Sequence, residues 1–291
     1  MNDSPPGPLR LALPKGRMQA GVAEMLEDAG IRILATARGY RPRLSLPDCE
    51  VKILKPQNIV EMLQLGSRDV GLTGADWVAE LDGEAVELLD TGLDPVRIVA
   101  AAPGDLLAGS GQLPRRRLIV ASEYERLTRR WIERRGLDAR FVRSYGATEV
   151  FPPEDADVIV DNTATGSTLE ANGLEIVDEI MVSSTRLYAG SGAMSDPRRK
   201  GRIEDLRLLL ASVLEARRRV MVEVNAPADR LEAIVGLLPC MREVTVSPLY
   251  GDSGFAVKAA VPRDRLPEVI PQVKAAGGSD VVVTRVGQIV P

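Results

Sequence analysis

Short runs of apolar residues alternate along the first part of the chain with segments of helical periodicity. Runs that fit strands lie at 9–13, 31–34, 51–54, 69–73, 86–89 and 97–101. Between them, apolar residues recur every three or four positions, and Gly30 and Pro56 stand where one helix would end and another begin. A basic stretch with two prolines, 38–47, predicts a loop or an irregular ribbon. This alternation favours an α/β fold with a largely parallel sheet flanked by helices.

The same pattern resumes after a segment rich in Gly and Leu, 103–114, which suggests a change of lobe or a surface loop. Further strands are expected at 118–120, 140–143, 158–160, 176–184 and 186–189. Ser122 is a predicted N-cap for a helix over 123–135, and Asp196 for a long amphipathic helix. The remainder, 220–283, has the order β-α-β-β-α-β, which is that of a ferredoxin-like domain. Modules of this order are often regulatory or oligomerisation units, an expectation that rests on fold analogy.

One stretch carries the strongest chemical signal. Residues 156–169 place a β-branched run before Asp161, then a loop of small and hydroxyl residues around Gly166, then a helical pattern that starts at Thr168. Backbone N–H groups at such a junction suit a phosphate, and the carboxylate before the loop could accept sugar hydroxyls. An ordinary strand-to-helix turn with an N-cap would have the same pattern, so both interpretations stay open at this point.

Two other strand-to-helix junctions are candidates for anion or ligand binding. Lys15, Gly16 and Arg17 follow the first strand and open a helix, although a solvated surface turn explains them equally well. The segment from Gly71 to Asp76 is the second junction, where tight packing of helix against strand is the alternative.

Composition narrows the chemistry. The chain has 291 residues, a net charge of −4 and no histidine, which excludes Ser-His and Cys-His nucleophiles and argues against a transition-metal site. General nucleic-acid binding is disfavoured by the negative charge. Cys49 and Cys240 lie too far apart in sequence to suggest a disulfide framework. The polar segment 1–8 is expected to be a disordered tail rather than a signal peptide, and no run is long enough to span a membrane, so a cytoplasmic location is expected.

Taken together, these stretches resemble the long form of ATP phosphoribosyltransferase, the family of the first enzyme of histidine biosynthesis. The most specific likeness is 156–169, followed by Asn172-Gly-Leu and Ser183-Ser184; supporting motifs are 13–17, 69–76, Asn225-Ala-Pro, 237–239 and 245–249. The resemblance implies a two-lobed core like a periplasmic binding protein, with lobe I at 1–98 and 186–216 and lobe II at 99–185. It also implies a C-terminal ACT-like regulatory domain at 217–291.

The implied reaction joins N1 of ATP to C1 of phosphoribosyl diphosphate and releases pyrophosphate. Adenine N1 has a free lone pair, so the attacking step needs no strong base, which is compatible with a chain without histidine. Mg²⁺ would be the cofactor, carried by the diphosphate near Asp161 rather than held by a dedicated ligand set. Histidine as effector and a homo-oligomer, hexamer or dimer, are implied in the same way.

The resemblance also assigns roles to residues. The phosphoribosyl-diphosphate element would be Asp161, Thr163, Ala164, Thr165, Gly166, Ser167 and Thr168. Nucleotide or phosphate contacts would come from Lys15, Gly16, Arg17, Thr73, Gly74, Asp76, Arg97 and Glu149. Asn225 and Thr245 would belong to the histidine site.

Several positions depart from the family's pattern. Asn162 stands where an aliphatic residue is usual, Ser167 where arginine is common, and Asn225 where an acidic residue is frequent. Glu149 lies one residue closer to the loop than usual. The stretch Lys55-Pro-Gln-Asn-Ile stands in place of a more basic Arg-Pro-x-Asp-Ile-Pro pattern. The alternatives to an enzyme are a two-lobed binding protein and an amino-acid sensor without catalysis.

Overall fold

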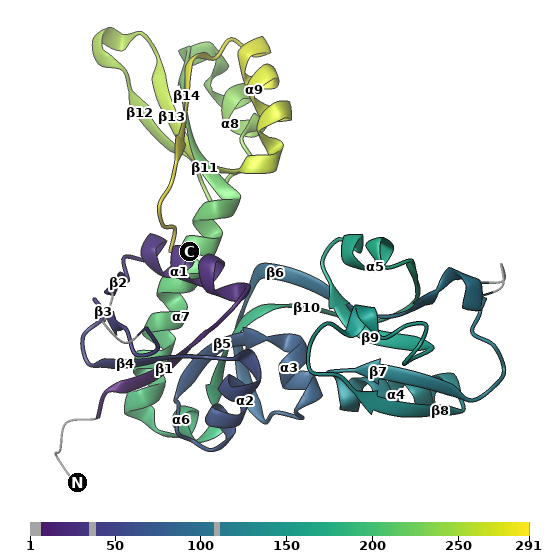
Figure 1. The fold of residues 1–291 in the computed structure, drawn as a ribbon. Coiled ribbons are helices and arrows are strands. Elements are labelled where there is room, and N and C mark those ends of the chain that lie inside the picture. The colour runs from purple at the N-terminus through teal and green to yellow at the C-terminus, as the bar shows by residue number, and fades with distance from the viewer. Residues whose placement is uncertain (1–6, 35–38, 108–110, 291) are drawn as a thin grey trace. The chain divides into compact units, whose positions relative to one another are not determined.

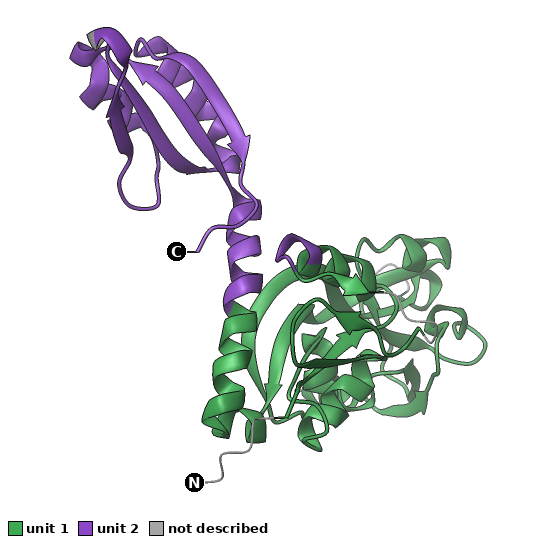
Figure 2. Cartoon of the chain, turned by 90° about the vertical axis from the view of Figure 1, so that its left-hand side faces the viewer, with its two compact units in different colours: residues 1–26, 31–207 green, residues 27–30, 208–291 purple. Residues whose placement is uncertain are grey.

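A computed structural model describes residues 7–34, 39–107 and 111–290. Most of the tail predicted at 1–8 therefore lies outside the described residues. The chain forms two compact units, one made of 1–26 and 31–207 and the other of 27–30 and 208–291 (Figure 2). The division of the first unit into lobe I and lobe II, which the resemblance implies, stays a prediction, since the contacts group these residues into one compact unit.

The first unit is built on an eight-stranded sheet (Figure 1). Its strands, in spatial order, are β4 (Cys49–Leu54), β1 (Leu9–Pro14), β5 (Val70–Gly74), β10 (Leu174–Gly190), β6 (Ala85–Pro103), β9 (Val158–Thr163), β7 (Leu118–Ser122) and β8 (Ala139–Arg143). The pairs at the two ends of the sheet are parallel, as the sequence predicts. The two central strands pair antiparallel with each other and with their outer neighbours, so the sheet as a whole is mixed.

The central strands differ from the sequence prediction. β6 joins two predicted strands into one of 19 residues, and β10 joins two others into one of 17 residues. The residues between the predicted strands are accommodated within the long ones: Gly92 and Asp94 have φ of +66° and +48°, and the β6–β10 register shifts at several points. Such bulges keep the chain in one ladder between separate apolar runs.

Helices cover the sheet of the first unit. They are α1 (Met18–Asp28), α2 (Pro56–Gln64), α3 (Ala75–Glu80), α4 (Glu125–Arg135), α5 (Ser167–Ala171), α6 (Ser191–Ser195) and α7 (Pro197–Arg218), which continues into the second unit. Short 3₁₀ turns lie at η1 (Gly104–Leu107) and η2 (Thr148–Val150). Two short strands, β2 (Ile33–Leu34) and β3 (Arg43–Leu44), pair antiparallel. β3 is a regular strand within the segment predicted as a loop or an irregular ribbon, 38–47, so that prediction was wrong for β3.

Of the two predicted N-caps, Asp196 is confirmed, whereas Ser122 is wrong because Tyr124 is the N-cap of α4. Asp196 Oδ1 accepts the backbone N–H groups of Arg198 and Arg199 at the start of α7. Helix α4 begins two residues later than predicted, because Ser122 is still in β7 and its Oγ accepts the N–H of Tyr124.

One core cluster of the first unit packs α4 against the sheet. Trp131 is 1% exposed and packs with the β-branched residues of β7 and β9, and its Nε1 donates to Asp178 Oδ2 at 2.8 Å. Tyr124 is equally buried and stacks on Trp77 with ring centroids 4.6 Å apart. These aromatic residues fix the turn between β7 and α4 close to α3.

The second unit has the predicted β-α-β-β-α-β order. Its elements are β11 (Arg219–Ala226), α8 (Leu231–Leu237), β12 (Thr245–Pro248), β13 (Phe255–Pro262), α9 (Leu266–Ala275) and β14 (Ser279–Arg285), with 3₁₀ turns η3 (Ala228–Arg230), η4 (Tyr250–Asp252) and η5 (Arg263–Arg265). The strands pair antiparallel in the order β12-β13-β11-β14. Alternate residues of β11 are buried, and the two helices lie on that face (Figure 1).

Within the described ranges, none of the helices combines the length and apolarity that crossing a membrane requires.

Candidate functional site

A cavity of about 320 Å³ opens at the carboxyl end of β9. Arg17, Glu149 and Asp161 line it together with the loop residues Asn162, Thr163, Ala164, Thr165, Ser167, Thr168 and Leu169. The three named side chains come from three separate segments: the turn after β1, the 3₁₀ turn η2, and β9 itself. The fold therefore brings together one cation, two carboxylates and the predicted small-residue loop.

The loop itself is shorter than the sequence predicts. β9 continues through Thr163, so Asp161 lies within the strand instead of closing it, and α5 begins at Ser167, one residue before Thr168. Gly166 holds φ of +91°, which glycine adopts without strain, and its N–H donates to Thr163 Oγ1 at 2.9 Å. This bond closes a tight turn, and Ala164, Thr165 and Ser167 of the turn line the cavity.

Asp161 has an unusual electrostatic environment. Burial raises the pKa of its carboxyl to about 6, and the charges of Glu149 and Glu123 act in the same direction. The N–H of Asn162 and the hydroxyl of Thr148 oppose this rise by donating to the carboxylate. Burial and the neighbouring carboxylates therefore disfavour the ionised form of Asp161 in the folded protein.

Only part of the Lys15–Arg17 motif reaches the cavity. Arg17 lines it, and Gly16 makes the turn with φ of +86°. Lys15 points elsewhere: its Nζ donates to the hydroxyl of Tyr40 at 3.0 Å and lies 5.0 Å from the centre of that ring. This contact lowers the pKa of Tyr40, chiefly through the hydrogen bond.

Arg97 lies beside the loop without lining the cavity. It is in β6, directly opposite Thr163 of β9. Its Nη1 is 3.4 Å from Glu179 Oε2, and both side chains are partly exposed.

The residues predicted at the β5–α3 junction face the protein interior. Thr73 is fully buried and donates to the carbonyl of Pro56 at 3.1 Å. Gly74 packs so closely that a Cβ there would overlap the Asp76 carboxylate and lie 3.1 Å from Met18 Cε. For these two residues the packing interpretation explains the sequence directly.

Asp76 is 3% exposed and is linked to the loop through hydrogen bonds. Its Oδ1 accepts from Ser183 Oγ at 2.6 Å and its Oδ2 from Tyr124 Oη at 2.8 Å. The Oη of Tyr124 in turn accepts from Asn162 Nδ2 at 3.3 Å. Burial and the Asp76 charge raise the pKa of Tyr124, so the phenol stays protonated. Sequence reasoning missed Tyr124, because a buried tyrosine after a strand carries no motif.

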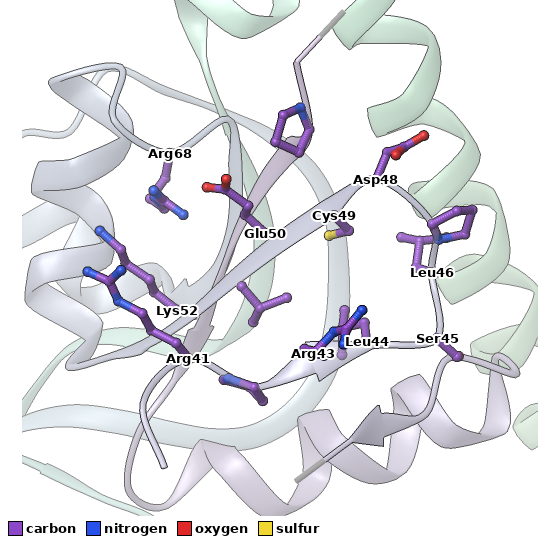
Figure 3. A pocket seen from close by; sticks show the side chains of 14 residues that line it. Arg41, Arg43, Leu44, Ser45, Leu46, Asp48, Cys49, Glu50, Lys52 and Arg68 are labelled. Atoms are coloured by element: carbon purple, nitrogen blue, oxygen red, sulfur yellow. The ribbon is translucent and has the colours of Figure 1, made fainter. Parts of the chain in front are cut away.

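A larger cavity, of about 510 Å³, lies by the amino ends of β1 and of the edge strand β4 (Figure 3). Arg41, Arg43, Lys52 and Arg68 line it together with the acidic residues at 48 and 50. The positive charge of Arg68 is the main cause that lowers the pKa of Lys52. None of the predicted site residues lines this cavity, since the loops that follow β1 and β5 are at the other end of the strands.

In the second unit, Asn225 and Thr245 lie on the sheet face away from the helices, with β13 between their strands. Asn225 Nδ2 donates to Asp280 Oδ2 at 3.0 Å, and Thr245 is exposed opposite Lys258. The structure therefore places the two residues on one face but not in contact.

Among the residues that the structure describes, no three His, Cys, Asp or Glu side chains gather to hold a metal ion. Asp161 and Glu149 line the same cavity, and one or two carboxylates are what Mg²⁺ commonly takes from a protein when phosphates supply its other ligands.

Comparisons with known proteins assign the chain to a family. A model of ATP phosphoribosyltransferase matches residues 55–212, and one of the HisG C-terminal domain matches 216–288. Residues 55–212 include β9, its loop and Glu149. The chain belongs to the ATP phosphoribosyltransferase family. Because both family models match in sequence order, it has the domain content of the long form.

Relatives in this family match the chain over nearly its whole length. ATP phosphoribosyltransferases from Pelotomaculum thermopropionicum and Desulforudis audaxviator are each 34% identical, over 97% of this chain and 99% of the relative. Among solved structures, an ATP phosphoribosyl transferase (HisG:HisZ) complex from Thermotoga maritima is similar with a TM-score of 0.61 and 28% identity. That match covers 70% of this chain and 98% of the other.

Proposed function

We propose that this protein catalyses the first step of histidine biosynthesis, the transfer of a phosphoribosyl group to N1 of ATP, with release of pyrophosphate. The observation that carries the proposal is the cavity in which Arg17, Glu149 and Asp161 meet the loop at the end of β9. These groups match the two parts of phosphoribosyl diphosphate, a polyhydroxylated sugar and its phosphates.

The loop and Asp161 would bind the ribose 5-phosphate part. The hydroxyls of Thr165, Ser167 and Thr168 line the cavity and can donate to phosphate oxygens. Asp161, in the strand just before the turn, can accept the ribose hydroxyls through its carboxylate. Arg17 also lines the cavity and is suited to the diphosphate, since a guanidinium binds phosphate oxygens with paired N–H groups.

The chemical step would depend on alignment and charge. Adenine N1 attacks C1 of the ribose, the C1–O bond to pyrophosphate breaks, and the bond electrons leave with the pyrophosphate. The transition state places positive charge on the ribose, which the nearby carboxylates of Asp161 and Glu149 can stabilise.

Mg²⁺ fits this site as a companion of the diphosphate. The two carboxylates that line the cavity, Asp161 and Glu149, would face the cation, and the substrate phosphates would complete its shell. When bound, the ion would neutralise the charge that develops on the leaving pyrophosphate.

The finer parts of the fold are proposals of the same kind. The two halves of the sheet, joined by β6 and β10, would act as lobes like those of periplasmic binding proteins, with the substrates between them. The second unit would be an ACT-like regulatory domain with histidine as effector, in a hexamer or dimer. The Asp280 carboxylate accepts a hydrogen bond from Asn225, the position where the resemblance implies an acidic residue. A carboxylate at this place could bind the ammonium group of an amino-acid effector, which supports the proposal.

The test is a spectrophotometric assay with ATP, phosphoribosyl diphosphate and Mg²⁺. Product absorbance is expected for the unaltered protein, and Thr168→Val is expected to raise the KM for phosphoribosyl diphosphate about tenfold by removing one hydroxyl from the phosphate site. Thr284→Val, an equal change at an exposed position of β14, serves as the control.

A folded protein that binds phosphoribosyl diphosphate but forms no product would refute catalysis and favour the binding-protein alternative. Adding millimolar histidine to the same assay tests regulation, and an unchanged rate would contradict the proposed effector.

A further inference from the structure

Asn162 follows Asp161 in β9, and its side chain makes contacts that an aliphatic residue cannot make. Its Nδ2 lies 3.1 Å from Asp161 Oδ1 and 3.3 Å from Tyr124 Oη. Its backbone N–H lies 2.7 Å from the same carboxylate oxygen. A carboxamide nitrogen carries two protons, so Asn162 has one donor for each of these two acceptors.

Tyr124 gives this contact a fixed anchor. Its ring is 1% exposed and stacks on Trp77, and its hydroxyl donates to the buried carboxylate of Asp76 at 2.8 Å. Asp76 is held in turn by Ser183 Oγ at 2.6 Å. Tyr124 and Asp76 are therefore held in place, since both are buried and the polar atoms of their side chains are hydrogen-bonded.

The near end has more freedom. Asp161 lies in the last part of β9, next to a turn of small residues, and its carboxylate lines the cavity. A carboxylate in such a position can rotate about its χ angles unless a donor fixes it. The Thr148 hydroxyl is one such donor. Asn162 supplies two more, because its backbone N–H and its Nδ2 both bond Oδ1, and Oδ2 is free of the contact with Asn162.

We propose that Asn162 is a positioning residue that ties the Asp161 carboxylate to the buried Tyr124–Asp76 pair, so that the second carboxylate oxygen is directed at the ribose hydroxyls of phosphoribosyl diphosphate. This inference rests on the proposed function, because it assigns Asp161 a ribose contact. Positioning of this kind improves binding by ordering the carboxylate before the substrate arrives.

The test compares dissociation constants for phosphoribosyl diphosphate, kcat and KM in a double-mutant cycle. Asn162→Leu keeps a similar size and removes both side-chain donors. It is expected to raise the Kd and KM for phosphoribosyl diphosphate about tenfold, as expected for loss of a bond to a charged group, and to change kcat less than about threefold. In the Asp161→Asn background the same change is expected to alter the Kd less than about twofold, because the group that Asn162 positions has already been replaced.

Tyr124→Phe tests the anchor. It removes the hydroxyl that accepts from Asn162 and is expected, as a single change, to raise the Kd about threefold. Added to Asn162→Leu, it should not raise the Kd above the value of Asn162→Leu alone. Asn58→Leu, the same change at an exposed position of α2, is the matched control and should leave the Kd unaltered. Melting temperatures of all variants separate loss of positioning from loss of folding.

Two results would overturn the inference while leaving the proposed function intact: an unaltered Kd in an active Asn162→Leu protein, or equal effects of Asn162→Leu with and without Asp161. Failure of the proposed function has a different signature, namely an unaltered protein that neither binds phosphoribosyl diphosphate nor forms product.

Discussion

Replacing Asp161 by asparagine should stabilise the protein while it disables the site. Burial raises the pKa of Asp161 from 3.8 to about 6, so the folded state disfavours the ionised carboxylate. A pKa that is higher by one in the folded than in the unfolded state corresponds to about 1.36 kcal/mol, which gives a cost to folding of roughly 3 kcal/mol at pH 7.5. Asparagine carries no charge and keeps an oxygen that can accept the N–H of Asn162, so it should remove most of this cost.

The cost to folding depends on pH. Because the folded pKa is raised, the cost is fully present above about pH 6 and disappears as the pH falls toward 3.8. At pH 5 it should be about 1.5 kcal/mol, half of its value at pH 7.5. The gain in stability from Asp161→Asn should shrink by the same factor.

Urea unfolding followed by circular dichroism at the two pH values measures the gain. Asp138→Asn provides the control, since that side chain is 75% exposed. An Asp161→Asn protein that is less stable than the unaltered one at pH 7.5, or whose gain is the same at both pH values, would refute the electrostatic reasoning. The phosphoribosyl-diphosphate assay on the same sample should show a loss of at least tenfold in kcat/KM, since the substrate loses a charged hydrogen bond.

Three further predictions concern the first unit. Gly71→Ala should destabilise it by about 1–3 kcal/mol in the same unfolding assay, because a Cβ would lie 2.7 Å from Ile59 Cγ2; an unchanged midpoint would contradict this packing. Cys49 should react slowly with a thiol reagent at pH 8, because burial raises the pKa of its thiol to about 11. The fast phase of labelling should then come from the other cysteine, Cys240, and Cys49→Ser should leave that phase unaltered. Asp69→Asn should cost about 2–3 kcal/mol at pH 7, since the carboxylate is 1% exposed and accepts from two arginines, whose bonds and charges lower its pKa despite burial. That cost should vanish as the pH falls below about 4, which acid unfolding curves of both proteins would show.

The sequence predicted the parts of the site that depend on neighbours along the chain. The strand, loop and helix around Asp161 and the turn through Gly16 were correct in kind, because local periodicity and small residues determine them. Boundaries were wrong by one to three residues: β9 runs on to Thr163, and α5 begins at Ser167. The hydrogen bonds of the ladder extend a strand beyond its apolar run.

The sequence by itself determined the α/β class, the β-α-β-β-α-β order of the second unit, and the family, since each rests on patterns or motifs that stay local in the chain. Only the tertiary structure decided which candidates meet. Arg17 and Glu149 reach the Asp161 loop, whereas Lys15 turns to Tyr40 and Thr73 is buried. The tertiary structure also brought the Asn162 side chain to the Tyr124 hydroxyl. The reason is that side-chain direction and burial depend on which strands become neighbours, and pairs such as Tyr124 with Asp76, 48 residues apart, have no signature in sequence spacing.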